Sequence, residues 1–253
     1  MGVSLRLILS SLIFLIGAVG PVKATCTTPI FPPMAFERPA WAALELLKPP
    51  PPALDGIIGR QDLDDDGHGD INLDFYSITL DANGQSAAAL LAELRRNLNE
   101  VIFADAGYSV EPADARQARL WAADAPLGAV MVFTLAEIPG VMALERGAVF
   151  VACASPTDFV FSTVEMAGPG LHPVAGNRAF GVHDHGNGSL SIYVMAADRV
   201  VARGAFGSLP GPLRERIFIE GDKVWRRMLD NIAYRYAPRT PRNPFVFSQR
   251  VAF

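Results

Sequence analysis

The sequence has few charged residues: Asp, Glu, Lys and Arg make up 19% of its 253 residues, whereas 50% of the residues are hydrophobic. A chain of this composition can bury a packed core, so it does not belong with intrinsically disordered proteins. Its length is sufficient for one large domain, or for one domain with an additional arm.

The sequence also lacks the short motifs of common enzyme classes. It contains no G-x-S-x-G, no H-E-x-x-H and no glycine-rich phosphate loop. Cys153 lies in the apolar run "VFVACA", where a cysteine more often belongs to the core or to a disulfide than acts as a nucleophile. Glu165, Arg178 and Arg199 could line the mouth of a cavity, but we interpret them as ordinary surface charges. A noncatalytic protein is therefore favoured over an enzyme, although the sequence does not exclude one.

Long apolar runs are scarce, and the longest stands at the beginning of the chain. Arg6 precedes an apolar run over residues 7–19, and Val22-Lys23-Ala24 follows it. This pattern predicts a secretory signal peptide over residues 1–24, and so a periplasmic or extracellular location. A membrane anchor is disfavoured because a spanning helix needs roughly 20 apolar residues. No later segment is long enough to span a bilayer as a helix, so we expect no transmembrane helix in the mature chain.

Removal of residues 1–24 takes away two cations, Arg6 and Lys23, and leaves 20 basic against 26 acidic residues, a net charge of -6. Nucleic acid is therefore an unsuitable partner. The mature chain keeps two cysteines, Cys26 and Cys153, and export to an oxidising compartment favours a disulfide between them. The sequence does not predict an oligomeric state.

Proline divides the mature chain into three parts. Residues 25–53 form a proline-rich arm that ends in "KPPPP", an extended polyproline segment. Residues 54–236 carry regular hydrophobic periods and form the folded domain. Residues 237–253 form a C-terminal tail, whose alternating apolar residues in "FVFSQRVAF" predict a strand that covers an edge of the sheet.

Hydrophobic periodicity predicts strands and helices within the folded domain. Six strands are expected from alternating or β-branched residues, over 71–80, 128–138, 147–155, 158–166, 177–184 and 189–197. Helical spacing predicts one helix over 86–103 capped by Ser86, a shorter one that Pro112 opens, and a long one over 223–236 capped by Asp222.

The order of these elements is similar to that of the START-like, or helix-grip, superfamily. The run "GLHPVAGNRAFGVHDHGNGSLSIYVMAADR" (170–199) resembles a segment of uncharacterised bacterial members. The resemblance implies an α+β fold in which a curved antiparallel sheet of about six strands packs on a long C-terminal helix around a cavity. Members mostly bind hydrophobic ligands, so the resemblance implies a binder or carrier of a hydrophobic small molecule, and the predicted signal peptide implies that it is exported. We expect Phe133, Tyr193, Trp225 and Met228 to line the cavity.

The stretch "DLDDDGHGDINLD" (62–74) provides a second candidate site, for calcium. Hard oxygen ligands at alternate positions can close around one ion. The candidate ligands are Asp62, Asp64, Asp66, His68 through its carbonyl, and Asp70. The stretch is not an EF-hand because the twelfth position lacks glutamate, and an acidic turn before a strand is the simpler alternative. The corresponding function would be a calcium-stabilised structural or interaction module of the cell envelope.

Overall fold

The computed structural model describes residues 26, 37–101, 103–104, 108–135, 137 and 145–253. The predicted signal peptide lies outside this part of the chain, as do residues 27–36 of the predicted arm. Within the described residues, no helix is both long enough and apolar enough to cross a membrane.

In the described part of the chain, nine antiparallel strands form one sheet. They are β1 (Ile57–Arg60), β2 (Gly67–Asp81), β3 (Ser109–Pro112), β4 (Val130–Leu135), β5 (Glu145–Ala154), β6 (Asp158–Met166), β7 (Val174–Asp184), β8 (Ser189–Val201) and β9 (Arg242–Val251). Their order is β3-β4-β5-β6-β7-β8-β2-β9, and β1 pairs with β6 beside this path. The α+β class and the antiparallel sheet agree with expectation, but the predicted number of about six strands is lower than the nine strands of this sheet. The strands β1 and β3 were missed because four residues give too short a pattern to recognise.

The helices are concentrated at the ends of the chain and between β2 and β4. They are η2 (Arg38–Trp41), α1 (Ala42–Glu45), α2 (Ala87–Arg96), α3 (Leu98–Val101), α4 (Ala115–Ala122), α5 (Gly204–Gly207), α6 (Gly211–Arg235) and η3 (Ala237–Arg239). Ser86 caps α2 as predicted, through its hydroxyl and the amide of Ala89 at 3.2 Å. The expected helix over 86–103 is interrupted at Asn97, and Pro112 ends β3 instead of opening a helix. The helix α4 begins later, with Asp114 as its cap.

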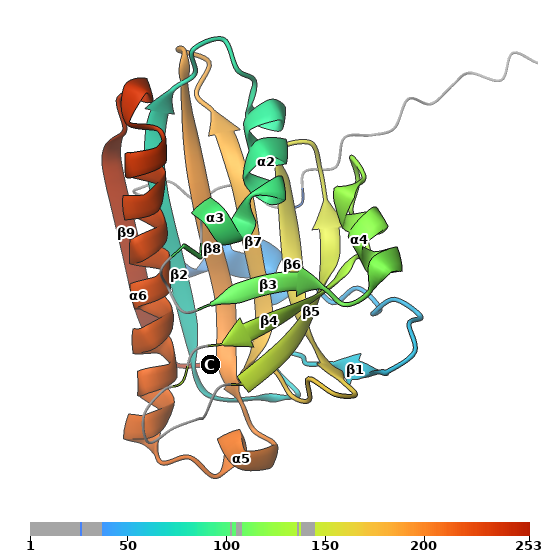
Figure 1. Ribbon diagram of the computed structural model, residues 1–253. Coiled ribbons are helices and arrows are strands. Elements are labelled where there is room, and N and C mark those ends of the chain that lie inside the picture. Colours follow the sequence, from blue (N-terminus) through green and yellow to red (C-terminus); the bar gives the residue numbers. More distant parts are fainter. Residues whose placement is uncertain (1–25, 27–36, 102, 105–107, 136, 138–144) are drawn as a thin grey trace, which may run out of the picture.

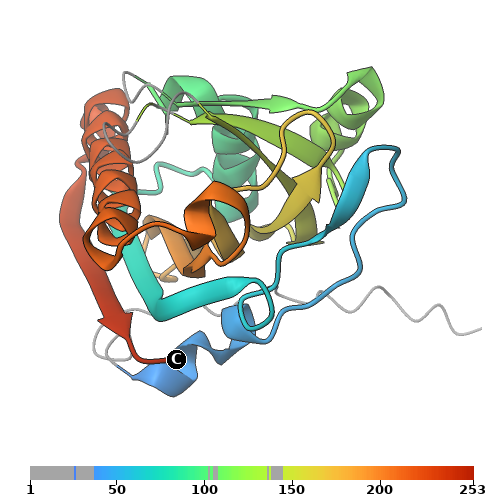
Figure 2. The same ribbon diagram turned by 90° about the horizontal axis from the view of Figure 1, so that it is seen from below.

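The two faces of the sheet are covered by different parts of the chain. The helices α2, α3 and α6 pack on the inner face of the curved sheet, whereas α1 lies on the outer face (Figures 1 and 2). Successive residues of β2 show the alternation that a strand imposes. The side chain of Tyr76 lies in the hydrophobic core on the inner face, which also contains Met228. The side chain of Phe75 lies in the hydrophobic core on the outer face, which also contains Trp41.

The long helix α6 begins twelve residues earlier than the sequence predicts. It spans 25 residues from Gly211, so Asp222 is not its cap but lies in its middle. The prediction was wrong because "EGDK" combines a glycine with an aspartate, which is the pattern of a helix start. The side chain of Asp222 instead joins α6 to the sheet.

The C-terminal segment completes the sheet. The strand β9 pairs with β2 at the edge, with Phe247 opposite Phe75, and this confirms the predicted tail strand. The ring of Phe247 stacks on Trp41 with centroids 5.8 Å apart. The segment therefore extends the outer core as well as covering the edge of β2.

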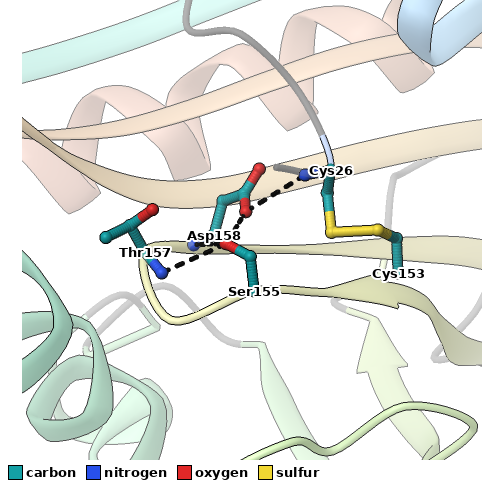
Figure 3. The surroundings of a disulfide bond; sticks show 5 residues. All are labelled: Cys26, Cys153, Ser155, Thr157 and Asp158. Carbon is teal, nitrogen blue, oxygen red and sulfur yellow. Dashed lines mark hydrogen bonds between the residues drawn. A yellow bond between two sulfur atoms is a disulfide. The ribbon is translucent and has the colours of Figure 1, made fainter. Parts of the chain in front are cut away.

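A disulfide joins Cys26 to Cys153 of β5, with their Cα atoms 5.6 Å apart (Figure 3). This confirms the predicted pairing. The amide of Cys26 lies 3.4 Å from Oδ1 of Asp158, beside the turn between β5 and β6. The disulfide thus fastens Cys26 to the outer face of the sheet.

Candidate ligand-binding cavity

A cavity of about 140 Å³, partly open to solvent, lies between the inner face of the sheet and α6. Residues of β2 and of β4 to β8 line one side, and residues 217–225 of α6 line the other. Seven of the 22 lining residues are Phe, Tyr or Trp: Phe103, Tyr108, Phe133, Phe161, Phe180, Phe218 and Trp225. The strand aromatics face the same way because each lies at an inward position of the strand alternation.

The aromatic rings hold one another in place by edge contacts. Phe103 meets Phe133 at a centroid distance of 5.6 Å and Trp225 at 5.9 Å. Phe180 meets Trp225 at 5.8 Å. Edge-to-face pairs at such distances are favourable beyond the area that they bury. Phe103, Phe133, Phe180 and Trp225 therefore form a connected set of rings that can contact a flat apolar molecule.

The floor of the cavity is a buried network of charged and amide side chains. Arg178 donates to Oδ1 of Asp74 at 2.8 Å, to Oδ2 of Asp74 at 2.9 Å and to Oδ2 of Asp198 at 2.9 Å. The amide of Asn72 donates to both Asp74 and Asp198 at 2.9 Å. Asp74 is 1% exposed and Asp198 5%. Buried charges are tolerated only when they are paired in this way.

Two carboxyl groups of the network, those of Asp74 and Asp198, are accompanied by two cations, Arg178 and Arg250, because Arg250 donates to Oδ1 of Asn72. Burial raises the pKa of Asp198 to about 6, although the charge of Arg178 acts in the opposite direction. The guanidinium of Arg178 also lies 4.3 Å from the centre of the Trp225 ring. This contact links the polar floor to the aromatic wall.

His172 forms a neutral part of the lining. Burial lowers the pKa of its imidazole to about 4, and the charge of Arg178 acts in the same direction. Its Nδ1 lies 3.1 Å from the carbonyl oxygen of Val174, and its ring meets Phe133 edge-on at 6.4 Å. A Cβ atom at Gly147 would lie only 2.4 Å from this ring, so the missing side chain of Gly147 makes room for the imidazole.

A second polar contact fixes α6 at the middle of the cavity. The hydroxyl of Tyr76 donates to Oδ1 of Asp222 at 2.6 Å, and the hydroxyl of Ser248 lies 3.2 Å from both carboxyl oxygens. Burial raises the pKa of Tyr76, so its phenol remains a proton donor. One carboxyl group thus joins α6 to both β2 and β9.

Two of the four residues predicted to line the cavity do so. Phe133 and Trp225 are part of the wall, whereas Met228 is fully buried in the core one turn beyond it. Tyr193 lies on the opposite face of the sheet, where its ring stacks on Phe75 at 6.1 Å and covers Gly181. Apolar residues occupy both alternating sets of positions along β8, so the sequence does not show which set faces inward.

The residues predicted to bind calcium have other partners. Asp62 pairs with Arg60, Asp64 with Lys48, and Asp66 with Arg203 at 2.8 Å. His68 lies in β2 opposite Val200, and Asp70 follows in the same strand. In the described part of the chain, no three His, Cys, Asp or Glu side chains are grouped as metal ligands. Calcium binding remains a prediction.

Sequence reasoning missed the polar floor. Arg178 was interpreted as a surface charge, yet its side chain is 17% exposed and lines the cavity. Glu165 and Arg199 lie elsewhere: Glu165 pairs with Arg203, and Arg199 donates to the carbonyls of Leu63 and Gly69. The available signal was the strand period, which places Arg178 on the same face as Phe180.

No protein-family model matches the sequence, and no curated protein matches it. Several solved structures are similar in shape. A Zhui aromatase/cyclase from a Streptomyces species has a TM-score of 0.46 at 12% identity, over 67% of this chain and 95% of that one. Norcoclaurine synthase of Thalictrum flavum has a TM-score of 0.35 at 12% identity, over 64% of this chain and 98% of that one. The di-domain aromatase/cyclase StfQ of the steffimycin pathway has a TM-score of 0.37 at 10% identity, over 66% of this chain and 53% of that one. Similarity at this level assigns no function to the chain.

Proposed function

We propose that the protein is an exported, noncatalytic binder or carrier of an uncharged, apolar small molecule, which it holds between the sheet and α6. The observation that carries the proposal is the aromatic-walled cavity of about 140 Å³ within the inner core. An apolar cavity of roughly 150 Å³ holds a ring the size of benzene. Because the cavity is partly open, a longer ligand can extend from it towards solvent.

The charges on the floor favour an uncharged ligand. Arg178 is already bound to Asp74 and Asp198, and Arg250 is bound to Asn72, so an anionic ligand would meet the two carboxyl groups without finding an unpaired cation. Repulsion between like charges is strong where water is excluded. A neutral molecule avoids this repulsion and still gains the contacts with the aromatic wall.

Other features support the remaining parts of the proposal. The sheet packed on α6 supports a helix-grip arrangement, and the Cys26–Cys153 disulfide supports export because disulfides persist in oxidising compartments. The polar groups of the floor are bonded to one another, and His172 is uncharged at neutral pH. These groups are thus suited to holding the shape of the cavity and less to proton transfer.

A matched pair of fluorescent probes tests the ligand class. N-phenyl-1-naphthylamine and 1-anilinonaphthalene-8-sulfonate share one ring skeleton, but only the second carries a negative charge. We expect the neutral probe to bind at least about tenfold more tightly. Asp198→Asn should reduce this preference because it removes one carboxylate from the floor. Failure of the neutral probe to bind, or equal binding of the two probes, would contradict the proposal.

Native mass spectrometry of protein purified from its own compartment then identifies the physiological ligand. The proposal expects a retained uncharged, apolar molecule. A retained calcium ion without such a molecule would instead favour the calcium-stabilised envelope module.

A further inference from the structure

Gly221 occupies an unusual place in the long helix. It lies in the middle of α6, and it lines the cavity. Four residues before it is Ile217 and four residues after it is Trp225, which both line the same cavity. Residues four apart share one face of a helix, so the missing side chain of Gly221 is a gap in the cavity wall.

Packing does not require glycine at this position. A Cβ atom added to Gly221 would have no heavy atom within 4 Å, and the backbone there has no positive φ. By contrast, a Cβ atom at Gly181 would lie 2.3 Å from the ring of Tyr193, so that glycine is required by a close contact. Glycine inside a helix is less favourable than alanine, because it loses more backbone freedom on folding. Gly221 therefore weakens α6 without relieving any contact in the protein.

The helix is also held at a fixed distance from the sheet at this turn. Asp222, the next residue, is bonded to Tyr76 of β2 at 2.6 Å and to Ser248 of β9 at 3.2 Å. These contacts keep α6 from moving towards the sheet and closing the gap, or away from it to accommodate a larger side chain. The space beside Gly221 is thus a built-in feature of the cavity.

We propose that Gly221 is the residue that determines the size of ligand this cavity accepts. The ligand's ring lies against the bare helix backbone at Gly221, with the aromatic wall on its other side. This inference rests on the proposed function, because it names the residue that makes room for the apolar ligand. The inference also implies that the ligand is a flat ring system, since the aromatic side chains and the backbone at Gly221 together leave a slot for a planar molecule.

Three variants test the role of Gly221: Gly221→Ala, Gly221→Leu and, as a matched control, Gly211→Leu. Gly211 lies in the same helix but is exposed at its first turn, away from the cavity. N-phenyl-1-naphthylamine is titrated into each full-length protein, and the melting temperature is measured with and without saturating probe. We expect Gly221→Leu to weaken probe binding at least about tenfold and to reduce the rise in melting temperature that the probe causes. Gly211→Leu should bind as the wild type does.

The variants without probe provide an independent readout. Gly221→Ala should raise the melting temperature by about 2–4 °C, because alanine stabilises a helix relative to glycine. If Gly221→Ala lowers the melting temperature instead, the position is constrained by packing and the inference is wrong. If the wild type and Gly221→Leu bind the probe equally, the inference is wrong but the proposed function stands. If the wild type does not bind the probe, the proposed function fails and the inference fails with it.

Discussion

Two buried groups in the cavity should give opposite dependences of stability on pH. Burial raises the pKa of Asp198 from 3.8 to about 6 and lowers the pKa of His172 from 6.5 to about 4. The carboxyl group of Asp198 binds its proton more strongly in the folded protein than in the unfolded chain. Its contribution to stability is therefore complete below pH 3.8 and is lost as the pH rises through 6. The unfolded chain protonates His172 more readily, so this contribution is lost as the pH falls from 6.5 to 4.

Single variants separate the two contributions. Each pKa difference corresponds to about 3 kcal/mol, at about 1.4 kcal/mol per tenfold change in proton affinity. Between pH 4 and 6.5, the free energy of unfolding of Asp198→Asn should rise by about 3 kcal/mol relative to the wild type. That of His172→Gln should fall by a similar amount relative to the wild type. A loss of packing in either variant lowers the free energy of unfolding equally at every pH, so it does not change the slope of that free energy against pH.

Urea denaturation at a series of pH values from 4 to 7 measures these slopes. Asp230→Asn is the control, since Asp230 is an exposed residue of α6. It should give the slope of the wild type. If Asp198→Asn and His172→Gln also keep the wild-type slope, burial does not shift the pKa values of these two groups, and the buried polar network of the cavity is contradicted.

Three further predictions concern stability. Cys26→Ser opens a disulfide that spans 127 residues, so the free energy of unfolding should fall by about 4–5 kcal/mol in urea, and an unchanged midpoint would contradict the role of the disulfide. Tyr76→Phe removes a hydrogen bond to a charged carboxyl group and should cost about 1.5–3 kcal/mol, whereas Tyr234→Phe, at an 88% exposed position, should cost nothing measurable by the same assay. The calcium hypothesis predicts that replacement of Asp62 and Asp66 by Asn lowers the melting temperature only when calcium is present. Equal shifts in calcium and in chelator would leave the stretch as an acidic turn.

Much of the fold could be predicted because the local patterns are strong. The hairpin of β7 and β8 has glycines and an asparagine in its turn, and Ser86 is a typical helix cap. The start of α6 could not be predicted, because Gly221 and Asp222 imitate a helix start, whereas the carboxyl group of Asp222 is bonded to Tyr76 of β2. Such contacts override local preferences and are not visible in one segment of sequence.

The cavity could be predicted only in part, for a related reason. Phe133 and Trp225 were found because apolar residues on inward-facing positions are common in a cavity wall. Tyr193 was misplaced because both faces of β8 are buried, so hydrophobicity does not distinguish them. The pairing of Arg178 with Asp74 and Asp198 joins residues up to 104 positions apart, and only the sheet register brings them together.

The central claim is that a ligand ring lies in the cavity between the sheet and α6, beside Gly221. The most direct test is anomalous diffraction from crystals of the wild type and of Gly221→Leu, both soaked with 1-bromonaphthalene. The account predicts a bromine peak in the wild type between Phe133, Trp225 and Gly221, and no such peak in the variant. A peak at the same place in both proteins, or a wild-type cavity without the bromine peak, would contradict it.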